Sequence, residues 1–76
     1  MLYNSQNIAD RIREQAKSQG KTLRALLNEC ELGINTVSNI YSGKDVLTLN
    51  FAKIADALDC SVDYLLGRTD QPDINR

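Results

Sequence analysis

The sequence predicts a compact all-α domain of five short helices. Apolar residues recur at the three- and four-residue spacings of helices, and no segment alternates apolar and polar residues as a strand would. Glycines follow three of the expected helices, at Gly20, Gly43 and Gly67. With 76 residues, 42% of them apolar and 25% charged, the chain is sized for one folded domain with a thin core and not for a disordered segment.

The first helix is expected to begin at Asn7, after an N-terminal arm of residues 1–6. The Asn7 side chain can cap the amide three residues further on, and Asp10 can return the bond. Gly20 would fill the left-handed position after the last turn. A narrow apolar stripe repeats every four residues and consists of Ile8, Ile12 and Ala16.

Thr22 is a suitable N-cap for the second helix. The apolar residues of this helix are spaced to bury one side: Leu23, Leu26, Leu27 and Cys30. The third helix is expected to run from Ile34 to Tyr41. Cys30 and Cys60 are interpreted as small buried hydrophobes, because two thiols without any histidine do not make a zinc site.

The fourth helix is expected from Thr48 to Asp59, and a final short helix follows the cap residue Ser61. One face of the fourth helix should join the core: Leu47, Phe51, Ile54, Ala55 and Leu58. The other face carries Lys53, Asp56 and Asp59. Three residues of the final helix would close the core: Val62, Leu65 and Leu66. The domain would then span residues 7–67, and residues 68–76 are expected to form a flexible polar tail.

The third helix has one face of short, neutral side chains. At about 100° per residue, this face forms one contiguous arc made of Ile34, Asn35, Ser38 and Asn39. Val37 and Ile40 fall on the opposite side and would anchor the helix. The arc suits the edge of a base pair, because Asn can bond bidentately to adenine and Ile can pack on a thymine methyl. A polar surface without any partner is the alternative interpretation.

The second and third helices meet at a tight joint, which is the helix-turn-helix arrangement. In that arrangement the second of the two helices enters the major groove of DNA and the first crosses the backbone. Thr22 would face one phosphate, with Lys21 and Arg24 beside it, and Lys44 would face another. The pattern therefore favours a DNA-binding surface centred on the third helix.

Charge and composition argue against several classes of function. The net charge of −1 gives no overall basic signal, although residues 1–44 hold six Lys or Arg and four Asp or Glu, whereas residues 45–76 hold three and six. No histidine, nucleophile–base pair or glycine-rich phosphate loop is present, so we expect no catalytic residue, metal or cofactor. No apolar run could span a bilayer or form the core of a signal peptide, so we expect a cytoplasmic protein without a membrane partner.

Two segments carry a family resemblance: "TLRALLNECELGINTVSNIYSGK" and "AKIADALDCSVDYLLGRTD". Over about residues 7–70 the chain resembles helix-turn-helix transcriptional regulators of the lambda-repressor type (Cro/cI-type, XRE family). The resemblance implies a five-helix fold that binds a palindromic operator in double-stranded DNA as a homodimer, as a repressor, with a small regulatory protein as a further possible partner. It implies base contacts by Ile34, Asn35, Ser38 and Asn39. It implies phosphate contacts by Thr22, Thr36, Ser42 and Lys44.

The sequence departs from the family pattern at several positions. Leu23 stands where the family often has a phosphate-binding Gln, Leu27 where it often has a small Ala, and Val46 where Pro is frequent. Tyr41 replaces a Glu that usually pairs with an Arg of the first helix. The matching first-helix position is Ala16, so we expect that ion pair to be absent.

Glu31 is the most consequential departure, because it occupies the turn position that usually holds Gly. A left-handed conformation at a non-Gly residue is disfavoured by about 1 kcal/mol. A second register avoids this cost, with Gly33 ending the second helix and Asn35 capping the third. We expect the family register, which leaves Asn35 free to contact bases.

A protein-interaction module, such as an antitoxin or adaptor that uses the same fold, is the alternative function. An exposed apolar patch formed by Tyr64, Leu66 and the edge of the fourth helix would support it. The same residues could instead belong to the core or to a small dimer contact.

Overall fold

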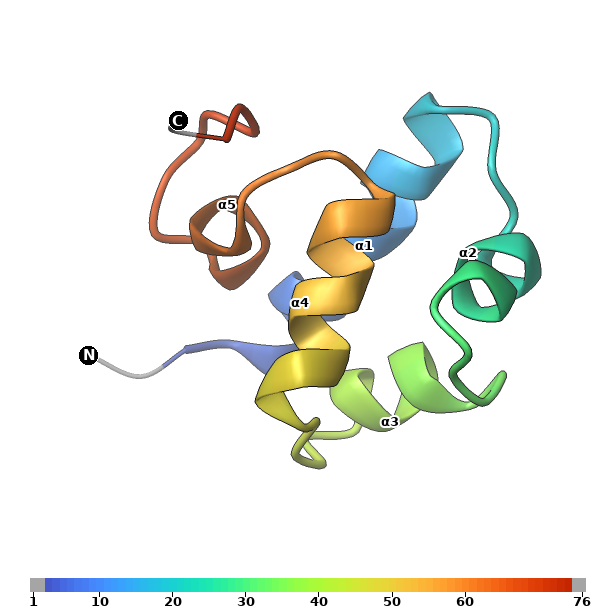
Figure 1. Ribbon diagram of the computed structural model, residues 1–76. Helices are drawn as coiled ribbons and strands as arrows, with labels where there is room; N and C mark the ends of the chain where they lie inside the picture. Colours follow the sequence, from blue (N-terminus) through green and yellow to red (C-terminus); the bar gives the residue numbers. More distant parts are fainter. Residues whose placement is uncertain (1–2, 75–76) are drawn as a thin grey trace.

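The computed structural model describes residues 3–74 and places five helices around one apolar core (Figure 1). The helices are α1 (Ser5–Ser18), α2 (Leu23–Glu29), α3 (Thr36–Tyr41), α4 (Thr48–Ala57) and α5 (Val62–Leu66). Residues 3–74 contain no strand, so the predicted all-α fold is confirmed. Residues 1–2 of the expected arm and residues 75–76 of the expected tail lie outside the described residues.

The helix α1 is the centre of the packing. It contacts α2, α3 and α5, while α4 packs against α2 and α5. The buried apolar residues form one cluster to which every helix contributes: Ala9, Ile12, Ala16, Leu26, Leu27, Cys30, Val37, Ile40, Phe51, Ile54, Ala55, Leu58, Cys60 and Leu65. Both cysteines are therefore part of the core, as the sequence predicts.

Two residues predicted to lie in the core are on the surface instead. Leu47 is 72% exposed, because it precedes α4 in an extended conformation and the helical periodicity does not apply to it. Val62 is 37% exposed, because α5 is a single turn that fully buries only Leu65. Leu66 is half-buried against the core, in partial agreement with the prediction.

The N-caps agree with the prediction for two helices and differ for the first. The hydroxyls of Thr22 and Ser61 accept the amides three residues further on, at 3.1 and 3.0 Å. The helix α1 begins at Ser5, two residues into the expected arm, because Asn4 is its N-cap and accepts the amide of Asn7 at 3.0 Å. The expected cap at Asn7 is therefore wrong, and Asn7 lies inside the helix.

All five helices end in the same left-handed turn. A positive φ occurs at the second residue after each of α1 to α4 and at the first residue after α5, and two backbone hydrogen bonds close each last turn, as in the Schellman motif. Glycine occupies three of these positions, which are Gly20, Gly43 and Gly67, as predicted. Glu31 and Asp59 occupy the other two, with φ of 57° and 50°. The helix α4 therefore ends at Ala57, before the predicted Asp59.

The backbone conformation of the turn between α2 and α3 distinguishes the two registers predicted from the sequence. Glu31 adopts the left-handed conformation, and the amide of Leu32 donates to the carbonyl of Leu27 at 2.9 Å. Gly33 does not have a positive φ. The expected register is thus confirmed, and the alternative in which Gly33 ends α2 is wrong. Asn35 occupies the N-cap position of α3, but its side chain makes no capping hydrogen bond.

Replacing Glu31 by Gly is expected to stabilise the fold by about 1 kcal/mol, because glycine adopts the left-handed conformation without a Cβ clash. In a domain of this size, that change corresponds to a rise in Tm of roughly 4–8 °C, measurable by thermal unfolding. Gly33→Ala is the matched control: its φ is not positive and its added Cβ would meet nothing within 4 Å. A lower Tm for Glu31→Gly would show that the Glu31 side chain stabilises the turn.

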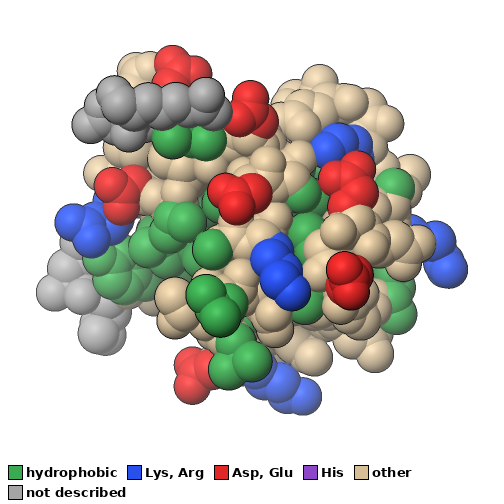
Figure 2. Space-filling model, viewed as in Figure 1, with side chains coloured by type: hydrophobic (Ala, Val, Ile, Leu, Met, Phe, Trp, Pro, Cys, Tyr) green, Lys and Arg blue, Asp and Glu red, His purple; other side chains and the backbone are tan. Residues whose placement is uncertain are grey.

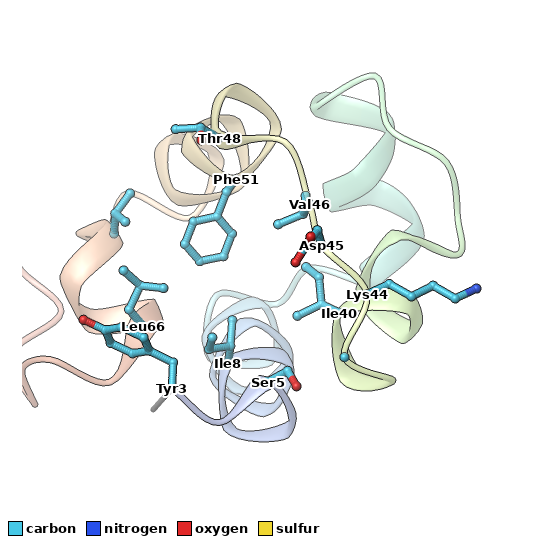
Figure 3. A pocket seen from close by; sticks show the side chains of 12 residues that line it. Tyr3, Ser5, Ile8, Ile40, Lys44, Asp45, Val46, Thr48, Phe51 and Leu66 are labelled. Atoms are coloured by element: carbon cyan, nitrogen blue, oxygen red, sulfur yellow. The ribbon is translucent and has the colours of Figure 1, made fainter. Parts of the chain in front are cut away.

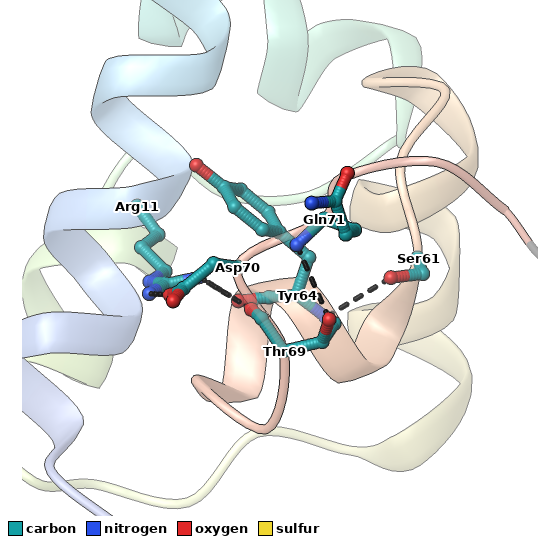
Figure 4. Close-up of polar contacts among 6 residues, drawn as sticks. All are labelled: Arg11, Ser61, Tyr64, Thr69, Asp70 and Gln71. Carbon is teal, nitrogen blue, oxygen red and sulfur yellow. Dashed lines mark hydrogen bonds and ion pairs between the residues drawn. The ribbon is translucent and has the colours of Figure 1, made fainter.

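Residues 68–74 have no regular secondary structure, and several of them form hydrogen bonds with the helical part. The guanidinium of Arg11 in α1 donates to three acceptors: the carbonyls of Tyr64 and Thr69, both at 2.9 Å, and the carboxylate of Asp70 at 3.1 Å. Arg11 also stacks on the Tyr64 ring, 4.5 Å from its centre (Figure 4). The amide of Ser61 donates to the carbonyl of Pro72 at 2.9 Å. The tail therefore closes over α5 and α1.

Candidate nucleic-acid interface

The helix α3 is anchored by its apolar side, as predicted. Val37 is 1% exposed and Ile40 is 4% exposed, and both face α1 and the core. Tyr41 at the end of α3 lies under the guanidinium of Arg13, which is 5.2 Å from the ring centre. This contact joins α1 to α3.

The four residues predicted to contact bases are all exposed. Ile34 is 54% exposed, and Asn35, Ser38 and Asn39 are also at the surface. Ile34 and Asn35 precede the first helical residue, Thr36, so α3 is two residues shorter than expected and only Ser38 and Asn39 lie within it. The exposure that the sequence predicts is confirmed, whereas the contact of these side chains with bases stays a prediction.

The amide groups on this surface have no partners in the protein. Within residues 3–74, the side chains of Asn35 and Asn39 form no hydrogen bond, so each can donate and accept towards another molecule. The hydroxyl of Ser38 donates to the carbonyl of Asn35 at 3.1 Å, which leaves its oxygen lone pairs as acceptors. An exposed helix face with unpaired amides is suited to bond an external surface that offers both donors and acceptors.

The residues predicted to contact phosphates fall into two groups. Arg24 and Lys44 are exposed, and neither forms an ion pair or a side-chain hydrogen bond within the described residues. The hydroxyl of Thr22 accepts the amide of Ala25, so its hydrogen is still available to a phosphate. By contrast, two hydroxyls already donate to backbone carbonyls: that of Thr36 to Gly33 at 2.7 Å and that of Ser42 to Ser38 at 3.0 Å.

Lys21, which was expected beside the first phosphate, is used inside the protein. Its ammonium donates to the carbonyl of Ala57 at 2.7 Å and pairs with Glu29 at 3.3 Å. Leu23 packs against the core and offers no polar side chain to a phosphate. Among the described residues, Arg24 is therefore the cation at the start of α2 that has no partner.

Sequence reasoning missed the contact between Arg13 and Tyr41. The expected partner position on α1 was Ala16, which is buried. Arg13 precedes Ala16 by three residues and so lies one turn earlier on the same side of α1. The spacing of three residues between Arg13 and Ala16 is the signal in the sequence that indicates this cation.

The thiols of Cys30 and Cys60 are buried. Burial raises the pKa of both thiols above the ordinary value, which favours their protonated form. Both are free cysteines, and the Cys30 thiol donates to the carbonyl of Lys53 at 3.4 Å. Across residues 3–74, no three His, Cys, Asp or Glu side chains are grouped as a metal would require. In the same region, no helix is long and apolar enough to cross a membrane.

Comparison with known proteins gives one informative similarity. No protein-family model matches the chain. The chain is similar to the cryptic phage CTXphi transcriptional repressor RstR of Vibrio cholerae serotype O1, with 36% identity over 62 residues. The match covers 80% of this chain but 55% of the repressor, so the chain spans about half the length of this curated relative.

Proposed function

We propose that this protein is a sequence-specific DNA-binding transcriptional regulator that acts as a homodimer and inserts residues 34–41 into the major groove. The observation that carries the proposal is the pair of exposed amides, Asn35 and Asn39, which lack partners within residues 3–74 and lie on the outer side of an anchored helix. The similarity to a phage transcriptional repressor supports the same class of function and favours repression.

The chemistry of the arc matches base edges. Asn35 and Asn39 can each bond bidentately to adenine, and Ile34 can pack on a thymine methyl. The arc carries no charge, so its contacts would depend on the sequence of the bases and not on the phosphates alone. The arc therefore supplies specificity in this proposal.

Affinity would come from the phosphate backbone. Arg24 at the start of α2 and Lys44 after α3 flank the arc in the chain and have no acidic partner within the described residues. Thr22 can add one hydroxyl donor. Thr36 and Ser42 are less suited to phosphates than the sequence suggests, because their hydroxyls already donate to carbonyls.

Selection from a random library of DNA duplexes tests the proposal. We expect a palindromic site whose half-sites are centred about 34 Å apart, or one helical turn, as two-fold related recognition helices require. The absence of any enriched sequence would contradict the proposal. If the protein also failed to shift duplex DNA but bound a second protein tightly, an antitoxin or adaptor role would replace it.

Lys44→Ala is expected to weaken binding to all duplexes alike and to reduce the slope of log affinity against log salt by about 1, because one phosphate contact is lost. Fluorescence anisotropy titrations at several salt concentrations measure this slope. Lys17→Ala is the matched control, since it removes the same charge from the far end of α1 (Figure 1). Equal slopes for the Lys44 variant and the unaltered protein would exclude Lys44 as a phosphate contact.

A further inference from the structure

Tyr41, at the end of α3, differs from the other large hydrophobic residues at the surface. Figure 2 shows hydrophobic side chains over the lower part of α4, and Leu47 and Leu49 at its start are 72% and 76% exposed. Tyr41 is 41% exposed, but the guanidinium of Arg13 in α1 lies over its ring, 5.2 Å from the centre. A cation at this distance is attracted to the face of the ring. Tyr41 is therefore an exposed aromatic residue with a defined partner on another helix.

The guanidinium of Arg13 is held by two groups. Its Nη1 atom donates to the carboxylate of Asp10, one turn earlier in α1, at 3.4 Å, and the ring of Tyr41 lies beneath it. An arginine can make both contacts at once, because its N–H groups lie in the plane of the guanidinium and a face stays free to rest on a ring. The Arg13 side chain is 39% exposed, so it is ordered by these contacts and not by burial.

The helix α3 is short and has few buried side chains of its own. It has six residues, which is less than two turns, and its buried residues are Val37 and Ile40. These two are neighbours on one side of the helix, so they resist sliding but resist rotation about the line that joins them only weakly. At about 100° per residue, Tyr41 lies about 40° from Val37 and about 100° from Ile40, away from that line. A contact at Tyr41 therefore opposes rotation of α3.

Hollow space adjoins this end of α3 on two sides. Ile40 lines an apolar groove of about 400 Å³, which the side chains of Ile40 and Ile8 border from α3 and α1 (Figure 3). Tyr41 lines a second, polar hollow of about 420 Å³, together with Ser42 and residues 3–6. These hollows leave room for the end of α3 to shift. The attraction between Arg13 and the Tyr41 ring acts against that shift.

We propose that Arg13 and Tyr41 are positioning residues, whose contact fixes the rotation of α3 on α1 and so the angle at which the arc meets the bases. This inference rests on the proposed function. Tyr41 follows Ser38 by three residues, so it borders the arc on the surface of the helix. The bidentate bonds expected of the arc require placement within about 0.5 Å and 10–20°. A modest rotation of α3 would therefore weaken discrimination between base pairs without removing any group that contacts DNA.

The strength of the contact sets the size of the expected effect. A contact shifts an equilibrium between two orientations of α3 by no more than its own free energy. A cation–π contact at an exposed site is worth a change of about two- to fivefold in an equilibrium constant. We define discrimination as the ratio of the affinity for one operator half-site to the affinity for the same duplex with one base pair changed. Loss of the contact should lower this ratio by about two- to fivefold.

Competition binding to half-site duplexes of the selected operator tests the inference. Tyr41→Leu removes the ring and should lower discrimination by about two- to fivefold, whereas Tyr41→Phe keeps the ring face and should retain it. Tyr64→Leu is the matched control, because it removes the same kind of contact, the ring 4.5 Å beneath the guanidinium of Arg11, from the side of α1 that packs on α5. It should lower the Tm but leave discrimination unchanged. Circular dichroism checks that each variant is folded at the temperature of the binding assay.

Arg13→Gln gives a second measurement. It should lower discrimination as Tyr41→Leu does, and the double variant should lower it no further, because both changes remove one contact. The slope of log affinity against log salt should stay that of the unaltered protein, since Arg13 is assigned no phosphate.

The outcomes separate this inference from the proposed function. Unchanged discrimination in Tyr41→Leu or Arg13→Gln, an equal fall in Tyr64→Leu, or additive losses in the double variant would overturn the positioning role alone. A salt slope reduced by about 1 in Arg13→Gln, with discrimination unchanged, would make Arg13 a phosphate contact instead. Failure of the unaltered protein to enrich any sequence would overturn both proposals.

Discussion

Leu27→Ala is expected to lower the free energy of unfolding by about 2–5 kcal/mol, because removing a fully buried leucine leaves a cavity that the neighbours fill only in part. Leu27 is 0% exposed and lies in α2. The Leu27 side chain is therefore part of the apolar core. A small domain has a total stability of about 5–15 kcal/mol, so the loss would be a large fraction of it.

Urea denaturation followed by circular dichroism measures this effect. Leu49→Ala is the matched control: it removes the same atoms from a residue that is 76% exposed and should change stability by less than about 0.5 kcal/mol. Comparable losses for the two variants would mean that Leu27 does not fill the core as described.

Asn39→Ala and Asn35→Ala are each expected to remove discrimination at one base pair, worth about 1–3 kcal/mol, while binding to unrelated duplexes stays nearly unchanged. The physical reason is that each exposed amide can supply a donor and an acceptor in the fixed geometry that an adenine edge requires. Competition between the selected operator and duplexes with single base changes measures the discrimination position by position.

Asn28→Ala is the control for these variants, because Asn28 is an exposed asparagine of α2 outside the arc. It should leave the preference at every base pair intact. If Asn35→Ala and Asn39→Ala lowered the affinity for all duplexes equally, as Lys44→Ala is expected to do, the assignment of α3 as the base-contacting helix would be wrong.

Local signals in the sequence predicted much of the fold. The caps at Thr22 and Ser61 and the left-handed glycines depend on neighbouring residues only, and they are found where expected. The start of α1 was missed because Asn4 and Asn7 are both suitable caps. The sequence contains nothing local that decides between two asparagines three residues apart.

Contacts between distant residues explain the other differences. Nothing near Arg11 in the chain indicates that its guanidinium bonds residues 64–70, so the tail was taken to be free. In the same way, Lys21 was expected beside a phosphate because its acceptor, the carbonyl of Ala57, is remote in sequence.

Periodicity correctly predicted which side of α3 is buried. Val37 and Ile40 are buried and Asn39 is exposed, because a helix with one apolar side can pack in only one orientation. The hydroxyls of Thr36 and Ser42 show the limit of this reasoning. Periodicity states which way a side chain faces, but it does not state whether its hydrogen is already bonded to the backbone.

The hydrogen bonds of Arg11 and Ser61 also determine how short a fragment of this chain can be and still keep these contacts. A fragment that stops at Gly67, the last residue of the helical part, would remove Thr69 and Asp70 from the Arg11 guanidinium and the Pro72 carbonyl from the amide that precedes α5. A boundary drawn from helices alone is therefore too early. The smallest piece that keeps these acceptors extends at least through Pro72.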